Sequence, residues 1–222
     1  QPSQEYAKKI GVQIVAVEEF PPKTVDLSTE LLRMQSKGVE YVFLQVLPST
    51  IVTALKNADR INYKPQFFGT WTSTDPDFFK LGQGVIKDRL AIQFPGGVPA
   101  DNSQGIKIMQ ELWKRYKTVN DFDAAYWEGV SIAMIMERAF VRAQEKYKVV
   151  NPQTINKAME SFRNENFWGL IPPVTYTARD HGASFTARIV RVGEDGSFTP
   201  LTNFYVPGKE KIKLIQGKSK GK

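Results

Sequence analysis

The sequence contains no cysteine, which excludes disulfides, thiolate metal sites and a cysteine nucleophile. His181 is the only histidine, so a histidine-based metal cluster is excluded and a Ser-His-Asp triad has little support. No apolar run approaches the roughly 20 residues that a membrane-spanning helix needs. The amino-terminal stretch, QPSQEYAKKI, lacks the basic start and apolar core of a signal peptide. No constellation of nucleophile, base or metal ligands typical of an enzyme is left.

Excess charge is also scarce outside the carboxyl terminus. The net charge is +7, but residues 209–222 hold six lysines and one acid and so account for +5 of it. We therefore predict that residues 207–222 form a solvated basic tail, with a binding arm as the alternative, and we expect no nucleic-acid partner. The whole sequence is 41% hydrophobic and 12% aromatic, and its 222 residues allow one large or two small domains with real cores.

The clearest pattern runs from Gly38 to Gly69. It begins with VEYVFLQV at 39–46, an apolar run without a polar face, which is typical of a parallel strand covered on both sides. Ser49 then caps a predicted helix whose apolar residues recur at three- and four-residue spacing. A second predicted strand follows at 66–69. This stretch therefore predicts a strand-helix-strand unit.

The flanking residues continue the alternation. An amphipathic helix end at 3–10, a strand at 12–20 and a helix capped by Asp26 precede the unit. A short helix capped by Asp75 and a strand at 89–94 follow it. This rhythm predicts an α/β fold with a doubly wound parallel sheet.

The pattern changes at the breaker cluster PGGVP, residues 95–99. Three helices are predicted beyond it, at 103–118, 122–147 and 152–162, the last capped by Asn151. With no strand between them, they either form a bundle or pack on strands that this sequence does not contain. Segments 186–192 and 197–201 flank a Gly-Glu-Asp-Gly turn and predict a hairpin.

Several of these segments resemble one protein family. They are VDLSTELLRMQSKGVEYVFL, ALKNA, KPQFFGT, AAYWEGVSIA and VTYTARDHGASFTARIVRVGEDGSF. In this order and spacing they are similar to the later two-thirds of the periplasmic leucine/isoleucine/valine-binding proteins. These are the substrate-binding subunits of ABC transporters with the type I periplasmic-binding-protein fold. The resemblance implies two α/β lobes joined by three crossings, with the ligand enclosed between them.

The resemblance also implies a division of the chain. Residues 1–94 are expected to form most of the C-terminal ligand-binding lobe, and residues 95–173 the helical part of an incomplete N-terminal lobe. Residues 174–206 are expected to cross back and to end in the hairpin of the C-terminal lobe. On this interpretation the sequence is a fragment, because the first half of the N-terminal lobe is missing.

In α/β units, ligands bind beyond the carboxyl ends of the strands. The positions that the resemblance places at the ligand are Val46, Leu47, Thr70, Trp71, Thr72, Phe122 and Asp123. No acid occurs between Thr70 and Thr74, which argues against an ordinary amino acid because a buried ammonium needs a carboxylate. Trp71 offers a broad face for an aromatic or apolar ligand, and Asp123 offers a negative charge from the other lobe.

Each position also has a structural alternative. Trp71 is equally suited to packing under a loop, Asp123 to capping a helix, and Val46 with Leu47 to forming a strand-end core. The function that the resemblance implies is an exported solute-binding subunit in the periplasm or cell envelope. It is expected to bind a small amino-acid-like or aromatic carboxylate and to dock on ABC permease subunits, without cofactor or catalysis. The alternative is a ligand-sensing or regulatory domain of the same fold.

Overall fold

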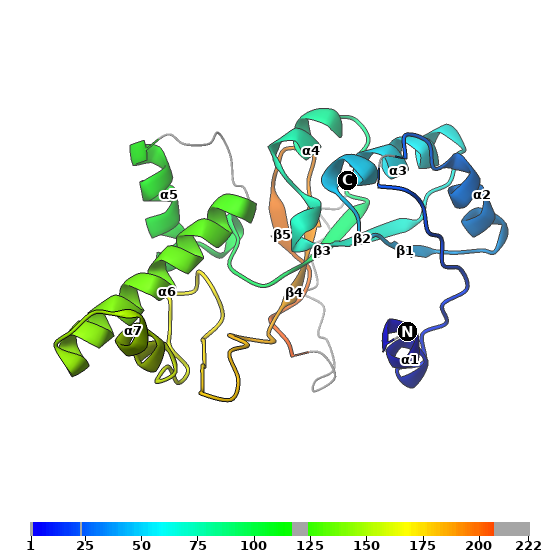
Figure 1. Ribbon diagram of the computed structural model, residues 1–222. Coiled ribbons are helices and arrows are strands. Elements are labelled where there is room, and N and C mark those ends of the chain that lie inside the picture. Colours follow the sequence, from blue (N-terminus) through cyan, green and yellow to red (C-terminus); the bar gives the residue numbers. More distant parts are fainter. Residues whose placement is uncertain (1, 23, 117–123, 207–222) are drawn as a thin grey trace.

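The computed structural model describes residues 2–22, 24–116 and 124–206. Its centre is a five-stranded sheet with the order β1-β2-β3-β4-β5 (Figure 1). The strands are β1 (Tyr41–Phe43), β2 (Gln66–Thr70), β3 (Leu90–Phe94), β4 (Arg188–Val192) and β5 (Phe198–Pro200). The first three run parallel, whereas β4 is antiparallel to both β3 and β5. The predicted α/β fold, its parallel strands and its terminal hairpin are confirmed.

The helices of this part are α1 (Pro2–Lys9), α2 (Ser28–Ser36), α3 (Pro48–Arg60) and α4 (Pro76–Leu81). In Figure 1, α2, α3 and α4 lie above the sheet and α1 lies below it. The buried residues of α3 include Ile51, Leu55 and Ala58, at the spacing that predicted this helix. The sheet therefore has one well-covered face, opposite α1.

Two of the four predicted caps are confirmed. Asp75 accepts a backbone hydrogen bond of 2.6 Å at the start of α4, and Asn151 accepts one of 2.9 Å further along the chain. The Ser49 cap is wrong, because α3 already begins at Pro48 and its N-cap residue, Leu47, makes no side-chain cap bond. Proline suits the first helical position because its missing N–H has no partner there anyway. The Asp26 cap is also wrong, because α2 begins at Ser28 and its N-cap residue is Leu27.

Two expectations at the first strands are wrong. Residues 12–20 are extended but form no strand, because a strand needs a hydrogen-bonded neighbour and no described residue pairs with the outer edge of β1. β1 itself is not covered on both sides: Val42 is buried, but Tyr41 is 67% and Phe43 63% exposed. Nothing in the described chain covers the face of β1 that carries these two rings.

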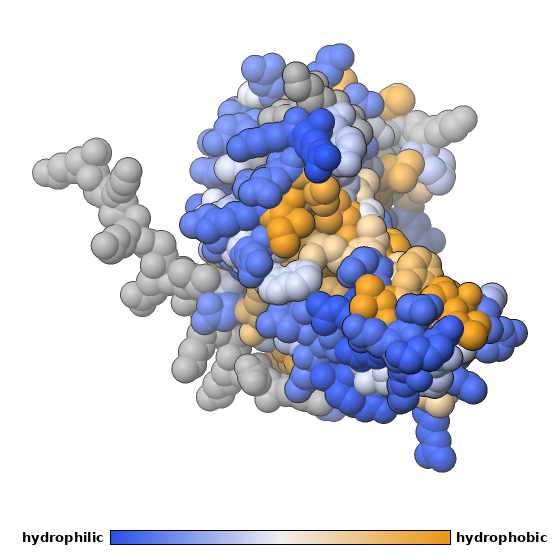
Figure 2. All heavy atoms as spheres, turned by 90° about the vertical axis from the view of Figure 1, so that its left-hand side faces the viewer, coloured by the Kyte–Doolittle hydropathy of each residue, from blue (hydrophilic) through white to orange (hydrophobic). Residues whose placement is uncertain are grey.

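The remaining helices are α5 (Gln104–Tyr116), α6 (Ala124–Tyr147) and α7 (Pro152–Met159). They lie at the opposite end of the molecule from α2 (Figure 1). α6 and α7 pack against each other, yet Ile132 is 53% and Phe140 41% exposed on α6. Figure 2 views the molecule from this end and shows apolar side chains gathered at its surface. The three helices therefore do not close into a self-sufficient bundle.

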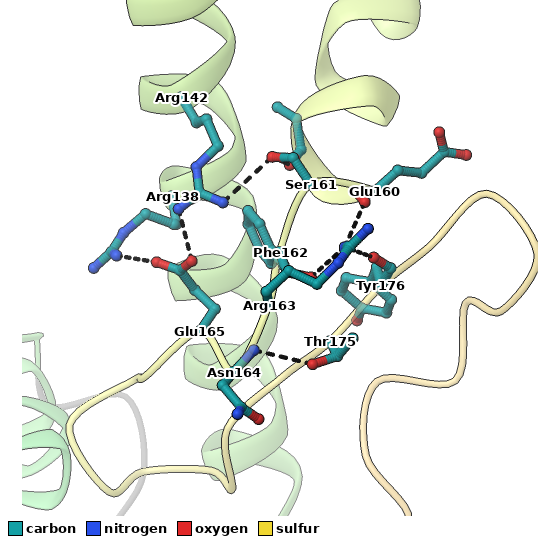
Figure 3. Close-up of polar contacts among 11 residues, drawn as sticks. Arg138, Arg142, Glu160, Ser161, Phe162, Arg163, Asn164, Glu165, Thr175 and Tyr176 are labelled. Atoms are coloured by element: carbon teal, nitrogen blue, oxygen red, sulfur yellow. Dashed lines mark hydrogen bonds and ion pairs between the residues drawn. The ribbon is translucent and has the colours of Figure 1, made fainter.

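Two arginines of α6 hold the segment that follows α7 (Figure 3). Glu165 pairs with both Arg138 and Arg142, and the Nη2 of Arg142 lies 2.6 Å from its carboxylate. The Arg142 guanidinium also lies 4.7 Å from the ring centroid of Phe162. Phe162 belongs to a small buried cluster with Ala139, Phe167 and Val174. These contacts fix the path of the chain as it leaves α7.

A larger core joins the sheet to the helices at the other end. It contains Phe67 and Ile92 from the sheet, Ile106 from α5, Trp127 from α6, and Leu170. The sheet and the first turns of α5 and α6 therefore share one apolar interior. Within residues 2–22, 24–116 and 124–206, no helix has the length and apolar character needed to cross a membrane.

Candidate functional site

The ends of β1 and β2 bring two loops to one edge of the sheet. The strands are parallel, with Phe43 opposite Phe68, and the Leu44 N–H donates to the Phe68 carbonyl at 2.7 Å. Val46, just beyond β1, is half-buried and packs on the large core, whereas Leu47 is 62% exposed. Parallel sheets bind ligands at this edge, so Leu47 is free to face one, while Val46 has a structural role as well.

The loop after β2 folds into a tight 3-10 turn, η1 (Trp71–Ser73). The Thr70 N–H donates to the Ser73 Oγ at 2.9 Å, which closes the turn on the strand end. A Cβ on Gly69 would lie 2.4 Å from that Oγ, so only glycine lets the turn fold back this closely. The hydroxyls of Thr70 and Thr72 bond to each other at 2.8 Å. The turn fixes the position of Trp71.

Trp71 lies between the sheet and α6. Its ring is half-buried and meets the Trp127 ring edge to face, with the centroids 6.4 Å apart and the planes inclined by 62°. Trp127, in the first turns of α6, is only 5% exposed and also packs on Phe94 at 4.8 Å. The contact with α6 therefore orients the Trp71 ring from the side opposite the sheet. Trp71 stays partly exposed.

Charge is sparse in the described part of this site. Asp75 is the nearest acid in the sequence after Trp71, and its carboxylate is used as the cap of α4. Phe122 and Asp123, the other two predicted positions, lie outside the described residues. The described loops thus present an indole ring, hydroxyls and an exposed leucine, without a carboxylate for an ammonium.

The two segments that connect the sheet to α5–α7 meet beside Trp127. We call residues 95–99 the first crossing and residues 169–173 the second crossing. The carbonyl of Leu170, in the second crossing, accepts hydrogen bonds from the Gly97 N–H at 2.8 Å and from the Trp127 indole N–H at 3.0 Å. A Cβ on Gly96 would lie 2.0 Å from the Trp127 ring, so the first crossing passes directly against it. Trp127 therefore touches both crossings.

A third connection is fixed by an ion pair. Arg188, at the start of β4, is buried and directs both Nη atoms to the Asp101 carboxylate, with Nη1 at 2.9 Å. Its guanidinium also lies 4.5 Å from the ring centroid of Phe204. The chain that returns to the sheet is thus joined to the segment that leaves it.

A family model described as "Periplasmic binding protein" matches residues 2–197. The chain belongs to the periplasmic binding protein family. The match covers β1 to β4 and the three connections described above, and it ends one residue before β5. A search of curated protein sequences finds no match.

Solved structures confirm the type I fold of this periplasmic binding protein. A branched-chain amino acid ABC transporter from Thermus thermophilus with bound valine matches with a TM-score of 0.81 at 24% identity, over 93% of this chain and 56% of that one. A fatty acid ABC transporter substrate-binding protein from Thermomonospora curvata has a TM-score of 0.80 at 17% identity, over 96% and 55%. A leucine binding protein from Thermotoga maritima has a TM-score of 0.71 at 16% identity, over 90% and 54%. The chain therefore spans little more than half the length of these structures.

Sequence reasoning missed the part of the site that depends on distant segments. Trp127 lies within the helix predicted at 122–147, and its contacts with Gly96 and Leu170 join residues far apart in the sequence. The local signal is the breaker cluster PGGVP at the first crossing, and the second crossing, GLIPP, is also rich in glycine and proline. Among the residues that the structure describes, no group of three or more histidines, cysteines or acids is arranged to hold a metal ion.

Proposed function

We propose that this periplasmic binding protein is the solute-binding subunit of an ABC uptake system of the branched-chain amino acid type. The observation that carries the proposal is the position of Trp71, half-buried at the carboxyl edge of the sheet and facing α6. Ligands of open α/β sheets bind at this edge. The ligand would lie against Trp71, with Leu47, Thr70 and Thr72 beside it, and Val46 supporting the loop.

The proposed division places the ligand between two lobes. Residues 1–94 and 174–206 would form the C-terminal lobe, and residues 95–173 would contribute helices to the N-terminal lobe. The exposed apolar side chains of α6 support this division, because such a face is normally covered. The similar structures, of which this chain spans about 55%, leave enough length for a sheet that would cover it. Phe122 and Asp123 would close the site from that side.

The proposed ligand is a small amino-acid-like or aromatic carboxylate. Trp71 supplies a flat apolar face, which suits an aromatic or branched side chain. The absence of an acid from Thr70 to Thr74 shifts the ammonium partner of an amino acid to Asp123 or removes the need for one. The Thermus thermophilus structure holds valine and the Thermomonospora curvata protein is described as a fatty acid transporter subunit, so similar structures take carboxylates with and without an ammonium group.

The mechanism is a shift between open and closed arrangements of the lobes. A ligand that contacts both lobes only when they are together stabilises the closed form by its extra contacts there. The closed form would then dock on permease subunits at the membrane, in the periplasm or cell envelope. No step requires a cofactor or forms a covalent bond, so the role is binding and not catalysis.

A thermal-shift screen of the complete protein tests this proposal. The probes are L-leucine, L-phenylalanine, benzoate and octanoate, which separate amino acids from simple carboxylates and aromatic from aliphatic side chains. A ligand present at 100 times its Kd stabilises the folded state by about 2.7 kcal/mol, which raises the melting temperature by a few degrees. Stabilisation by at least one probe in the wild type and its loss in Trp71→Ala is the expected result. Equal shifts in both proteins would contradict the proposed site.

A further inference from the structure

The side chain of Trp127 makes contacts with four different segments of the described chain. Its ring packs edge to face on Trp71, makes a tilted contact with Phe94 at the end of β3, and lies directly against Gly96. Its indole N–H donates to the Leu170 carbonyl at 3.0 Å. One rigid side chain therefore links the candidate ligand loop to both crossings.

The geometry leaves the Trp127 ring little freedom. It is 5% exposed, and a Cβ on Gly96 would lie 2.0 Å from its Cζ2 atom, so the backbone of the first crossing forms one wall of its site. The Leu170 carbonyl that it bonds also accepts the Gly97 N–H at 2.8 Å. A rotation of one crossing relative to the other would have to break the hydrogen bonds to the Leu170 carbonyl or move the indole as well.

We propose that Trp127 is a positioning residue that couples Trp71 to the crossings. It holds the Trp71 ring in the orientation that receives the ligand, and it makes that orientation depend on the arrangement of the two crossings. This inference rests on the proposed function, in which Trp71 contacts the ligand. A change at the crossings should then reach Trp71 through Trp127.

The test uses the full chain labelled with 5-fluorotryptophan and observed by fluorine NMR without ligand. Replacing each tryptophan in turn by phenylalanine assigns the signals. In Trp127→Phe, which keeps an aromatic ring but loses the N–H, the Trp71 signal should shift and broaden. Gly96→Ala pushes on Trp127 from the first crossing and should move the Trp71 signal as well. Gly129→Ala is the matched control on α6, because a Cβ there meets nothing within 4 Å, and should leave the signal unchanged.

Exchanging the Trp127 ring changes its ring current at the Trp71 label directly, so the readout in Trp127→Phe is the width of the Trp71 signal, whereas in Gly96→Ala, which keeps both rings, it is the position. A purely structural role for Trp127 would lower stability without broadening the signal in the first variant or moving it in the second. If circular dichroism shows that both variants are folded and neither change is seen, the proposal is overturned. If Trp127→Phe fails to fold, Gly96→Ala still tests the proposal. If Gly96→Ala fails to fold, Trp127→Phe still tests it.

A binding measurement separates this inference from the proposed function. With the strongest of L-leucine, L-phenylalanine, benzoate and octanoate as probe, Trp127→Phe should weaken binding about two- to tenfold, the worth of the lost hydrogen bond from the indole N–H. If Trp71→Ala weakens binding and Trp127→Phe does not, the site stands and the coupling is refuted. If neither variant changes the affinity, the ligand role of Trp71 fails, and the functional coupling fails with it.

Discussion

The indole rings of Trp71 and Trp127 meet edge to face, with centroids 6.4 Å apart, although one follows a strand of the sheet and the other lies on α6. Such a pair is worth about 0.5–1.5 kcal/mol beyond the area that it buries. It joins the loop proposed to hold ligand to the helix beside both crossings. The contact makes the ligand loop and the connections between the two ends of the molecule parts of one apolar cluster.

The turn that carries Trp71 depends on Gly69. In Gly69→Ala the added methyl group would lie 2.4 Å from the Ser73 Oγ and 2.9 Å from its Cβ, so the turn must open. We expect a loss of about 1–3 kcal/mol in the free energy of unfolding, as for other overpacked sites. Urea unfolding followed by circular dichroism measures it. Gly129→Ala, which meets open space, should cost nothing, and equal stability of the two variants would contradict this account of the turn.

Two glutamates near Phe162 provide a matched pair for testing the α6 clamp, by which we mean the ion pairs of Glu165 with Arg138 and Arg142. Glu165 is mostly buried and pairs with Arg138 and Arg142. Glu160 instead contacts the exposed His181 at 3.2 Å and accepts a hydrogen bond from Asn156 at 3.1 Å. Glu165→Gln should lower the free energy of unfolding by about 1–3 kcal/mol, because two arginines lose their charged partner. Glu160→Gln should stay within about 0.5 kcal/mol of the wild type. The same urea measurement compares them, and equal effects would show that the clamp is not stabilising.

Asp26 should titrate at unusually low pH. A hydrogen bond from Arg60, followed by one from the Ser28 N–H, lowers the pKa of its carboxyl from 3.8 to about 2. Because the folded pKa lies below the unfolded one, the stabilisation is present above about pH 4 and is lost as the pH falls towards 2. In Arg60→Gln the pKa of Asp26 should rise towards 3.8.

Carboxyl carbon NMR of the full chain measures this titration. The pKa of Asp195 serves as the internal control, because it is lowered by hydrogen bonds from Ser197 and not by Arg60. It should be the same in the wild type and in Arg60→Gln. An Asp26 pKa that stays near 2 without Arg60 would assign the shift to Ser28 alone.

The parts of the fold that depend on neighbouring residues could be predicted from the sequence. The α4 cap at Asp75 and the periodicity of α3 are local, and the short hairpin between β4 and β5 follows from its turn. The strand predicted at residues 12–20 does not form, because a strand exists only beside a partner and none of the described residues pairs with this segment. The prediction that β1 is covered on both faces is wrong for a similar reason, because no described segment covers Tyr41 and Phe43.

The candidate site also has a part that the sequence predicts and a part that it does not. Trp71 and its hydroxyl neighbours could be placed from the strand-end rule alone, since β1 and β2 are parallel and consecutive. The contact with Trp127 joins residues separated by more than fifty positions, and no local pattern indicates it. Whether Leu47, Thr70 and Thr72 touch a ligand stays a prediction.

The central claim is that the ligand lies against Trp71. Isothermal titration calorimetry of the complete protein with the strongest of the four probes, in the wild type and in Trp71→Ala, tests it most directly. Trp168→Ala, at a partly exposed tryptophan outside the proposed site, is the control. The account predicts that Trp71→Ala weakens binding by more than about 1 kcal/mol while Trp168→Ala leaves it unchanged. An unchanged affinity in Trp71→Ala would contradict the account and return Trp71 to a role in packing alone.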